Sequence, residues 1–128
     1  MRLLLDTHVI LWALDDFNLL SDEMISAARA LPSPTFVASA ASLWEIAIKV
    51  AKGKLHAPAD LPAKLRRDGF EILEVTAEHA WAVRTAPAAV ANKDPFDRLI
   101  FTQAKLERLT LATRDEVLLR SGLDVIRA

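Results

Sequence analysis

The sequence contains no cysteine, which excludes a disulfide framework, a zinc site built from thiolates and a cysteine nucleophile. It also contains no apolar run that is long enough and sufficiently free of charge to cross a bilayer. The N-terminal apolar run meets Asp6 too early for a signal peptide, so we expect a cytoplasmic protein with no membrane partner. The fold must therefore be stabilised by side-chain packing.

The sequence also lacks an excess of charge of either sign, because it has 16 lysine and arginine residues and 17 aspartate and glutamate residues. A chain with a formal net charge of −1 has no long-range field that attracts a polyanion. Nucleic-acid binding would then need bound cations or local basic clusters. The hydrophobic fraction of 52% is slightly above the usual range for soluble domains, which predicts some apolar surface reserved for a partner.

Short apolar runs of strand length alternate with segments of helical periodicity. The strand-like runs span residues 3–5, 35–38, 70–75, 110–112 and 125–126. Between them, residues 24–31 and 99–106 carry apolar side chains three and four positions apart, as amphipathic helices do. Strands that are apolar on both faces and alternate with helices imply a mostly parallel sheet covered by helices on both sides. With 128 residues, we expect one α/β domain over residues 1–128.

Two aspartates follow strand-like runs and precede predicted helices. Asp6 comes directly after residues 3–5, and Asp115 follows shortly after residues 110–112. Either side chain could cap the following helix, because aspartate is a good N-cap residue. Either could equally belong to a site, since open parallel sheets bind ligands outside the carboxyl ends of their strands.

Three further acids lie in predicted helices or at their start, and each has a structural alternative. Glu45 either forms a capping box with Ser42 or an ion pair with Lys49, four residues later. Asp94 precedes a proline at the start of a helix, which favours a capping role. Asp97 lies in the same first turn and suits either a site or the helix dipole.

The site hypothesis and the capping hypothesis differ in whether the acids must lie close together in the fold. Acids at the ends of neighbouring parallel strands would meet in a small volume: Asp6, Glu45, Asp97 and Asp115. Capping does not require such a meeting, and crowded carboxylates repel one another unless a cation lies among them. Oxygen ligands suit Mg²⁺ or Mn²⁺ better than zinc, and a metal pair held in this way can activate water against a phosphodiester. The sequence therefore predicts a metal-dependent hydrolase.

Two other groups of residues are weaker candidates. Three histidines lack metal-ligand spacing, and we expect each at the surface or partly buried: His8, His56 and His79. A basic run is more typical of a solvated face than of a nucleic-acid site: Lys49, Lys52 and Lys54.

Four motifs, in this order, carry a family resemblance. They are Leu3-Leu4-Leu5-Asp6-Thr7-His8, Ser42-Leu43-Trp44-Glu45-Ile46, Asp94-Pro95-Phe96-Asp97-Arg98-Leu99-Ile100 and Thr113-Arg114-Asp115. Together they resemble PIN-domain ribonucleases, specifically the VapC-like toxins of toxin–antitoxin pairs. The resemblance implies a three-layer α/β/α sandwich around a parallel sheet of strand order 3-2-1-4-5.

The resemblance also implies a site and partners. The metal-binding, catalytic acids would be Asp6, Glu45, Asp97 and Asp115, supported by Asp94, Thr7, Ser42 and Thr113. Similar toxins use Mg²⁺ or Mn²⁺, cut RNA endonucleolytically, form homodimers and are silenced by a cognate antitoxin. We expect an antitoxin helix in an apolar groove near Leu11 and Trp12, with a basic side chain reaching the carboxylates. The residues that bind RNA are not predicted.

Three alternatives compete with this interpretation. A phosphatase of the haloacid-dehalogenase type would need Asp-x-Asp-x-Thr, but His8 occupies the place of the second acid. A receiver-type signalling domain would need a lysine after its last strand, where this chain offers only Arg127. A catalytically silent PIN-type module that binds RNA or a protein partner is the alternative of a different class, and the intact acids are unexpected for it.

Overall fold

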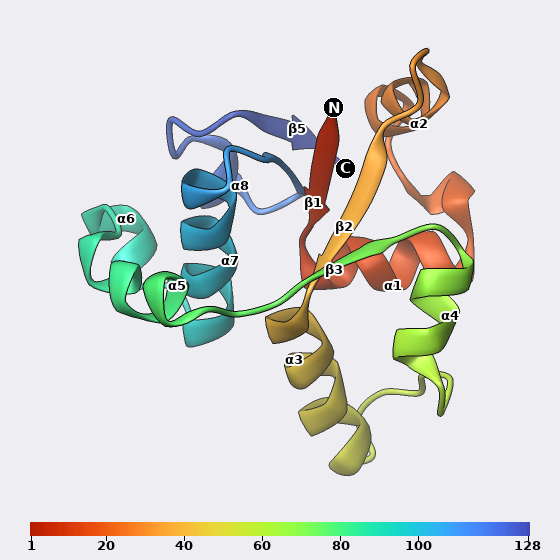
Figure 1. Ribbon diagram of the computed structural model, residues 1–128, viewed down its shortest axis with the longest axis horizontal. Coiled ribbons are helices and arrows are strands. Elements are labelled where there is room, and N and C mark those ends of the chain that lie inside the picture. The colour runs from red at the N-terminus through yellow and green to blue at the C-terminus, as the bar shows by residue number, and fades with distance from the viewer.

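The computed structural model describes residues 1–128, and its centre is a five-stranded sheet (Figure 1). The strands are β1 (Arg2–Leu5), β2 (Thr35–Ser39), β3 (Glu71–Leu73), β4 (Thr110–Thr113) and β5 (Val125–Arg127). Their order is β3-β2-β1-β4-β5, and every neighbouring pair is parallel. The predicted α/β class and strand order are confirmed.

The remaining residues form mainly helices. These are α1 (Thr7–Asp15), α2 (Asp22–Arg29), α3 (Ala40–Ala51), α4 (Leu61–Arg67), α5 (Ala77–Ala82), α6 (Ala88–Ala91), α7 (Pro95–Leu106) and α8 (Glu116–Leu119), with short 3₁₀ turns η1 (Phe17–Leu19) and η2 (Val83–Thr85). None of them is both long and apolar enough to cross a membrane.

The alternation of side chains along β1 divides the core into two layers. Leu3 and Leu5 are fully buried against α1, α2 and α4, whereas Leu4 is buried on the opposite face against α6, α7 and α8. Successive side chains of a strand point to opposite faces, so an uninterrupted apolar run must be covered on both sides. Figure 1 shows α1, α2 and α4 on one side of the strands and α5 to α8 on the other, which makes a three-layer sandwich.

The order of strands reverses around β1. The chain moves outward from β1 to β2 and β3, then returns so that β4 pairs with the other edge of β1. Parallel neighbours need crossover connections, and these are the helices that cover the sheet. The carboxyl ends of β1, β2 and β4 therefore lie close together at the switch point, where open α/β sheets bind ligands.

The third strand is shorter than predicted. It spans Glu71–Leu73, not residues 70–75. Phe70 precedes it because its backbone N–H donates to the carbonyl of Leu65 at 2.9 Å, which closes the end of α4. The carbonyl of Glu74 accepts from the side chain of Gln103 at 3.2 Å and so bonds to a helix side chain. Hydrogen-bond partners outside the sheet thus hold the backbone at Phe70 and at Glu74.

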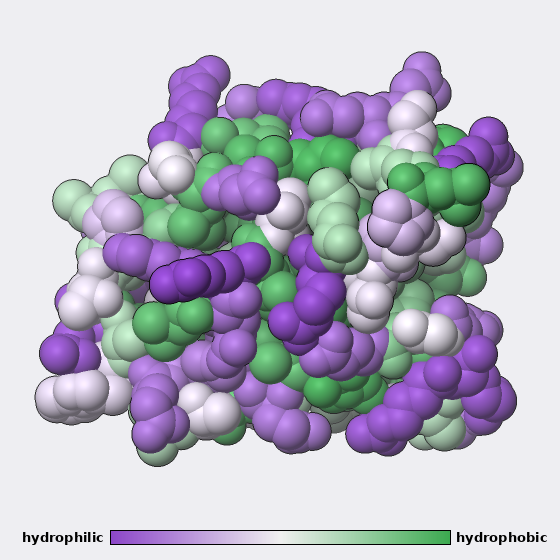
Figure 2. Space-filling view, turned by 45° about the horizontal axis from the view of Figure 1, so that its top comes forward, coloured by the Kyte–Doolittle hydropathy of each residue, from purple (hydrophilic) through white to green (hydrophobic).

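The surface carries several exposed apolar side chains. Trp44 and Trp81 are more than half exposed, and Leu31 projects almost fully into solvent. On the face seen in Figure 2, hydrophobic residues lie scattered between hydrophilic ones. Part of the high hydrophobic fraction of the sequence therefore lies on the surface and not in the core.

Candidate active site

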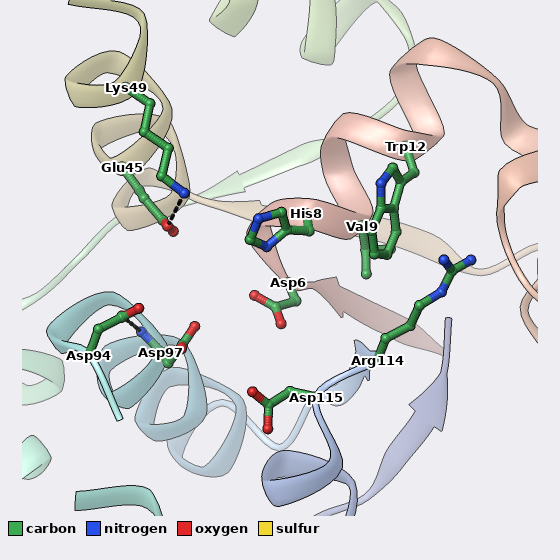
Figure 3. Close-up of a pocket in the computed structure, with 10 residues that line it drawn as sticks. All are labelled: Asp6, His8, Val9, Trp12, Glu45, Lys49, Asp94, Asp97, Arg114 and Asp115. Atoms are coloured by element: carbon green, nitrogen blue, oxygen red, sulfur yellow. Dashed lines mark hydrogen bonds and ion pairs between the residues drawn. The ribbon is translucent and has the colours of Figure 1, made fainter. Parts of the chain in front are cut away.

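Five acidic residues line one cavity at the carboxyl ends of the strands (Figure 3). Asp6 follows β1, Asp115 follows β4, Glu45 projects from α3, and Asp94 and Asp97 lie at the start of α7. The cavity has a volume of about 280 Å³. Figure 3 shows the carboxylates of Asp6, Glu45, Asp97 and Asp115 directed toward this shared space. The predicted convergence of the four acids is therefore present in the fold.

Asp6 is buried at the bottom of the cavity. Its carboxylate accepts hydrogen bonds from the backbone N–H of Thr7 at 2.7 Å and from the hydroxyl of Thr113 at 2.9 Å. Burial raises the pKa of Asp6 above its ordinary value, and these two hydrogen bonds oppose the rise only in part. The hydroxyl of Thr113 thereby links the ends of β1 and β4.

Ser42 has a different role from the predicted cap. Helix α3 begins at Ala40, and the hydroxyl of Ser39 accepts from the N–H of Ala41 at 3.0 Å. Ser42 consequently lies inside the helix, so its capping box with Glu45 is wrong. Its buried hydroxyl instead accepts from the hydroxyl of Thr7 at 2.9 Å, which joins α3 to α1 beside the cavity.

The predicted ion pair between Glu45 and Lys49 is confirmed. The Nζ atom of Lys49 lies 3.1 Å from Oε2 of Glu45, as the four-residue spacing predicted. Glu45 is only 7% exposed, and its Oε1 atom is buried with no hydrogen-bond partner. Buried carboxylate oxygens are normally paired because an unpaired one loses its hydration without compensation. This oxygen therefore suits a cation or a water molecule in the cavity.

Asp97 is the most strongly perturbed acid. Burial and the neighbouring charges of Asp6 and Asp94 raise the pKa of Asp97 to about 7, while Lys93, 3.8 Å away, lowers it only in part. The carboxylate of Asp94 accepts from the backbone N–H of Asp97 at 2.9 Å and caps α7, as predicted. A cation in the cavity would relieve the repulsion that Asp97 experiences.

Asp115 both caps α8 and contacts Lys93. Its carboxylate accepts from the N–H groups of Val117 at 2.9 Å and Leu118 at 3.1 Å. Burial raises the pKa of Asp115, but the hydrogen bonds from Lys93 and Leu118 outweigh it, and the pKa lies below its ordinary value. The same contact raises the pKa of Lys93.

Two lysines act as internal counter-ions for the acids. Lys49 pairs with Glu45, and Lys93 contacts both Asp115 and Asp97. In this arrangement no three acids lie close enough together to hold one metal ion. Mutual repulsion separates the carboxylates, and each lysine draws its partner toward itself.

The role of Lys93 was not predicted from the sequence. Its four-residue spacing from Asp97 is a usable signal for one of its contacts. Its contact with Asp115 joins residues 22 positions apart and has no local signal.

Aromatic and basic side chains form the remaining wall of the cavity. The guanidinium of Arg114 lies over the ring of Trp12, 4.1 Å from its centroid, and donates to the carbonyl of Ala128 at 2.7 Å. Arg114 is thus held by its own contacts at the cavity edge. His8 lines the cavity beside them, as Figure 3 shows.

His79 is fully buried, so the expectation of a surface or partly buried residue is wrong. Its Nδ1 atom accepts from the backbone N–H of Thr76 at 3.1 Å, which leaves Nε2 to donate to Glu107 at 2.8 Å. It lies on α5, outside the acidic cavity. These contacts satisfy both ring nitrogens inside the protein and give His79 a structural role.

Comparisons with known proteins agree with this architecture. A family model described as PIN domain matches residues 3–122. No curated protein matches the chain.

Several solved structures are similar over nearly the whole chain. VapBC2 from Rickettsia felis, bound to a DNA fragment from their promoter, is 19% identical with a TM-score of 0.69, and 98% of each chain is covered. VapBC-1 from nontypeable Haemophilus influenzae is 19% identical with a TM-score of 0.70, covering 98% of this chain and 97% of that chain. A toxin–antitoxin complex from Klebsiella pneumoniae is 23% identical with a TM-score of 0.57, covering 97% and 95%. At these identities, the likeness shows the shared fold.

Proposed function

This chain belongs to the PIN-domain family, and on that premise we propose that it is a metal-dependent endoribonuclease. In this proposal Asp6, Glu45, Asp97 and Asp115 are the catalytic acids, and they bind Mg²⁺ or Mn²⁺. Thr7, Ser42, Thr113 and Asp94 support them.

The observation that carries the proposal is that these four acids line one cavity although they come from separate segments. Asp6 and Asp115 each also bond a helix N-terminus, so capping accounts for part of their contacts. Capping does not account for Glu45, which lies in the middle of α3 and turns a buried carboxylate toward the other three. A common ligand explains why all four share one space.

The chemistry of the donors fits a hard divalent cation. All four side chains offer carboxylate oxygens, the ligands that Mg²⁺ and Mn²⁺ prefer, and Oε1 of Glu45 has no partner within the protein. When bound, such an ion lowers the pKa of water and stabilises charge on the phosphodiester oxygens.

The protein's own residues prepare the site in two ways. Thr113 and the N–H of Thr7 hold the carboxylate of Asp6, and Asp94 holds the backbone of the first turn that carries Asp97. Lys49 and Lys93 neutralise part of the acidic charge: Lys49 pairs with Oε2 of Glu45 and leaves Oε1 free for an ion, whereas Lys93 would compete with an ion for Asp115.

The proposed biological role is that of a toxin restrained by a cognate antitoxin. The similar structures named above are VapBC and toxin–antitoxin complexes, which supports the same kind of partner here. An RNA-cutting enzyme acting in the cytoplasm needs such restraint. A homodimer, the state implied by the resemblance, remains a prediction.

We propose a groove between α3 and α4 for the antitoxin helix. An apolar cavity of about 540 Å³ lies there, with Leu43, Ile46 and Leu61 among its walls. Leu11 lines a smaller hollow that shares Ala57 and Pro58 with this cavity, so the two adjoin. Trp12 faces the acidic cavity instead. In this proposal an apolar helix of the antitoxin occupies the groove, and a basic side chain of the antitoxin reaches the carboxylates.

A cleavage assay with defined RNAs in Mg²⁺, Mn²⁺ or excess EDTA tests the enzymatic proposal. We expect cleavage only with added ions, and loss of cleavage in Asp6→Asn and Asp97→Asn. Asp22→Asn, which removes an exposed carboxylate at the first turn of α2, is the matched control. Undiminished cleavage in EDTA would refute the metal site, whereas RNA binding without cleavage under any condition would support the silent binding module.

A further inference from the structure

A second hollow adjoins the acidic cavity along the outer side of α3. It has a volume of about 280 Å³, and its walls include Lys49, Lys52, Lys54 and Phe96. Glu45, Lys49 and Asp94 line both this hollow and the acidic cavity. A polymer lying in one would therefore lead directly into the other.

The chain reversal at the end of α3 gathers the three lysines. Gly53 adopts a φ of +70°, a left-handed conformation that favours glycine, and ends the helix. The backbone N–H of Lys54 then donates to the carbonyl of Lys49 at 2.9 Å. Lys54 is thereby folded back over the turn that carries Lys49, with Lys52 between them. The basic run becomes a compact cluster.

Most of this positive charge is available to a ligand. Lys49 pairs with Glu45, but Lys52 and Lys54 are exposed and take part in no ion pair. With a net charge of −1, the chain can attract a polyanion only through such local clusters. Lysines that serve only solubility have no reason to line a hollow, whereas these lysines line one that adjoins the acidic cavity.

Aromatic rings lie at the same place. Phe96 lines the hollow, and the ring of Trp44 packs against it edge to face, with centroids 5.0 Å apart. Trp44 is 61% exposed even so, and it also lines the apolar cavity between α3 and α4. Unpaired RNA bases stack on exposed aromatic side chains, whereas the bases of a duplex are already stacked. Lysines beside an open aromatic ring therefore suit a single strand.

From these observations we propose that Lys52 and Lys54, with Lys49, Phe96 and Trp44, form a subsite for single-stranded RNA. The lysines contact the phosphates and Trp44 stacks on a base, which leads the strand to the acidic cavity. The subsite rests on the proposed nuclease function for its substrate class. Its binding can nevertheless be measured without cleavage.

The test uses the full chain in EDTA and a fluorescent single-stranded oligouridine of about 12 nucleotides. Fluorescence anisotropy gives its Kd at several salt concentrations. For Lys52→Gln/Lys54→Gln we expect Kd to rise about tenfold. We also expect the slope of log K against log salt to fall by about 1.4, because each phosphate contact with a single strand contributes about 0.7. The control is Lys105→Gln, which removes one exposed lysine at the far end of α7. It should change the Kd and the salt slope by less than half of the changes expected for the double variant.

Trp44→Ala tests the stacking contact. We expect Kd to rise about fivefold or more with the salt slope unchanged, because stacking removes no phosphate charge. Unaltered RNA affinity together with a changed oligomeric state would show that the surface binds protein, and would overturn the proposal. Equally tight binding of an RNA duplex would overturn the preference for single strands.

The cleavage assay separates the two proposals. If the double lysine variant binds and cuts RNA like the wild type, the subsite is wrong and the nuclease assignment stands. If the variant loses RNA binding although no protein cleaves RNA in any metal, the nuclease assignment is wrong and the binding site stands. A variant with an unchanged circular dichroism spectrum excludes misfolding as the cause.

Discussion

Replacing Asp97 by asparagine should stabilise the metal-free protein at alkaline pH. The pKa of Asp97 is raised from 3.8 to about 7 by burial and by the charges of Asp6 and Asp94. A group whose pKa is higher in the folded state stabilises the fold at low pH, and this contribution is lost as the pH rises through the folded pKa. For Asp97, the wild type should therefore lose stability between about pH 4 and pH 7.

The size of the effect follows from the same shift. At about 1.36 kcal/mol per pKa unit, a rise of about three units sets an upper limit of roughly 4 kcal/mol. Asparagine removes the charge, which relieves both its desolvation and its repulsion by Asp6 and Asp94, but the amide is itself partly buried and polar and so recovers only part of that limit. We expect Asp97→Asn to raise the free energy of unfolding by about 1–2 kcal/mol at pH 8 and by almost nothing at pH 4.

The assay is urea unfolding at pH 4, 6 and 8, first in EDTA and then in Mg²⁺ or Mn²⁺. A ligand that binds only the folded state stabilises it by about 2.7 kcal/mol at one hundred times its Kd. Added ions should therefore stabilise the wild type more than the variant, so that the order of stability at pH 8 reverses. If Asp97→Asn is less stable than the wild type at pH 8 in EDTA, and ions stabilise both equally, Asp97 serves the helix and not a metal site.

Three further outcomes are expected. Asp6→Asn should abolish RNA cleavage while leaving the metal-free protein at least as stable, which activity and melting measurements together check; a sharp drop in melting temperature with activity intact would contradict it. Lys93→Gln should lower the Kd for Mn²⁺ several-fold in calorimetry, because the ammonium no longer competes for Asp115, and weaker binding would argue against competition. Gln103→Leu should reduce the free energy of unfolding in urea by about 1–3 kcal/mol, because the hydroxyl of Ser39 loses its buried acceptor; an unchanged value would mean that water replaces the amide.

The elements that depend on neighbours in the sequence were predictable. Residues 3–5 are apolar on both faces, which correctly predicts a strand covered by helices on each side. Asp94 before a proline correctly predicts the start of α7. The positions of Asp6 and Asp115 after strands predict the edge at which they meet, because parallel strands share the direction of their carboxyl ends.

Contacts between distant segments had no such signal. The sequence alone left a capping box of Ser42 with Glu45 open as one of two alternatives, but the exact start of α3 depends on Ser39, which donates a hydrogen bond to Gln103 from α7. His79 is buried because α5 docks on α7, at whose end Glu107 accepts a hydrogen bond from its ring. Each of these outcomes depends on a partner more than 25 residues away along the chain.

The sequence by itself thus determined the layers of the fold and the edge of the sheet where four carboxylates gather, since strand and helix periodicity are properties of consecutive residues. Only the tertiary structure decided which cations from distant segments of the chain face those carboxylates. Lys93 reaches Asp115 across 22 residues, and the left-handed turn at Gly53 folds Lys54 back beside Lys49. Electrostatic interactions depend on distance in space, and the folded backbone sets that distance.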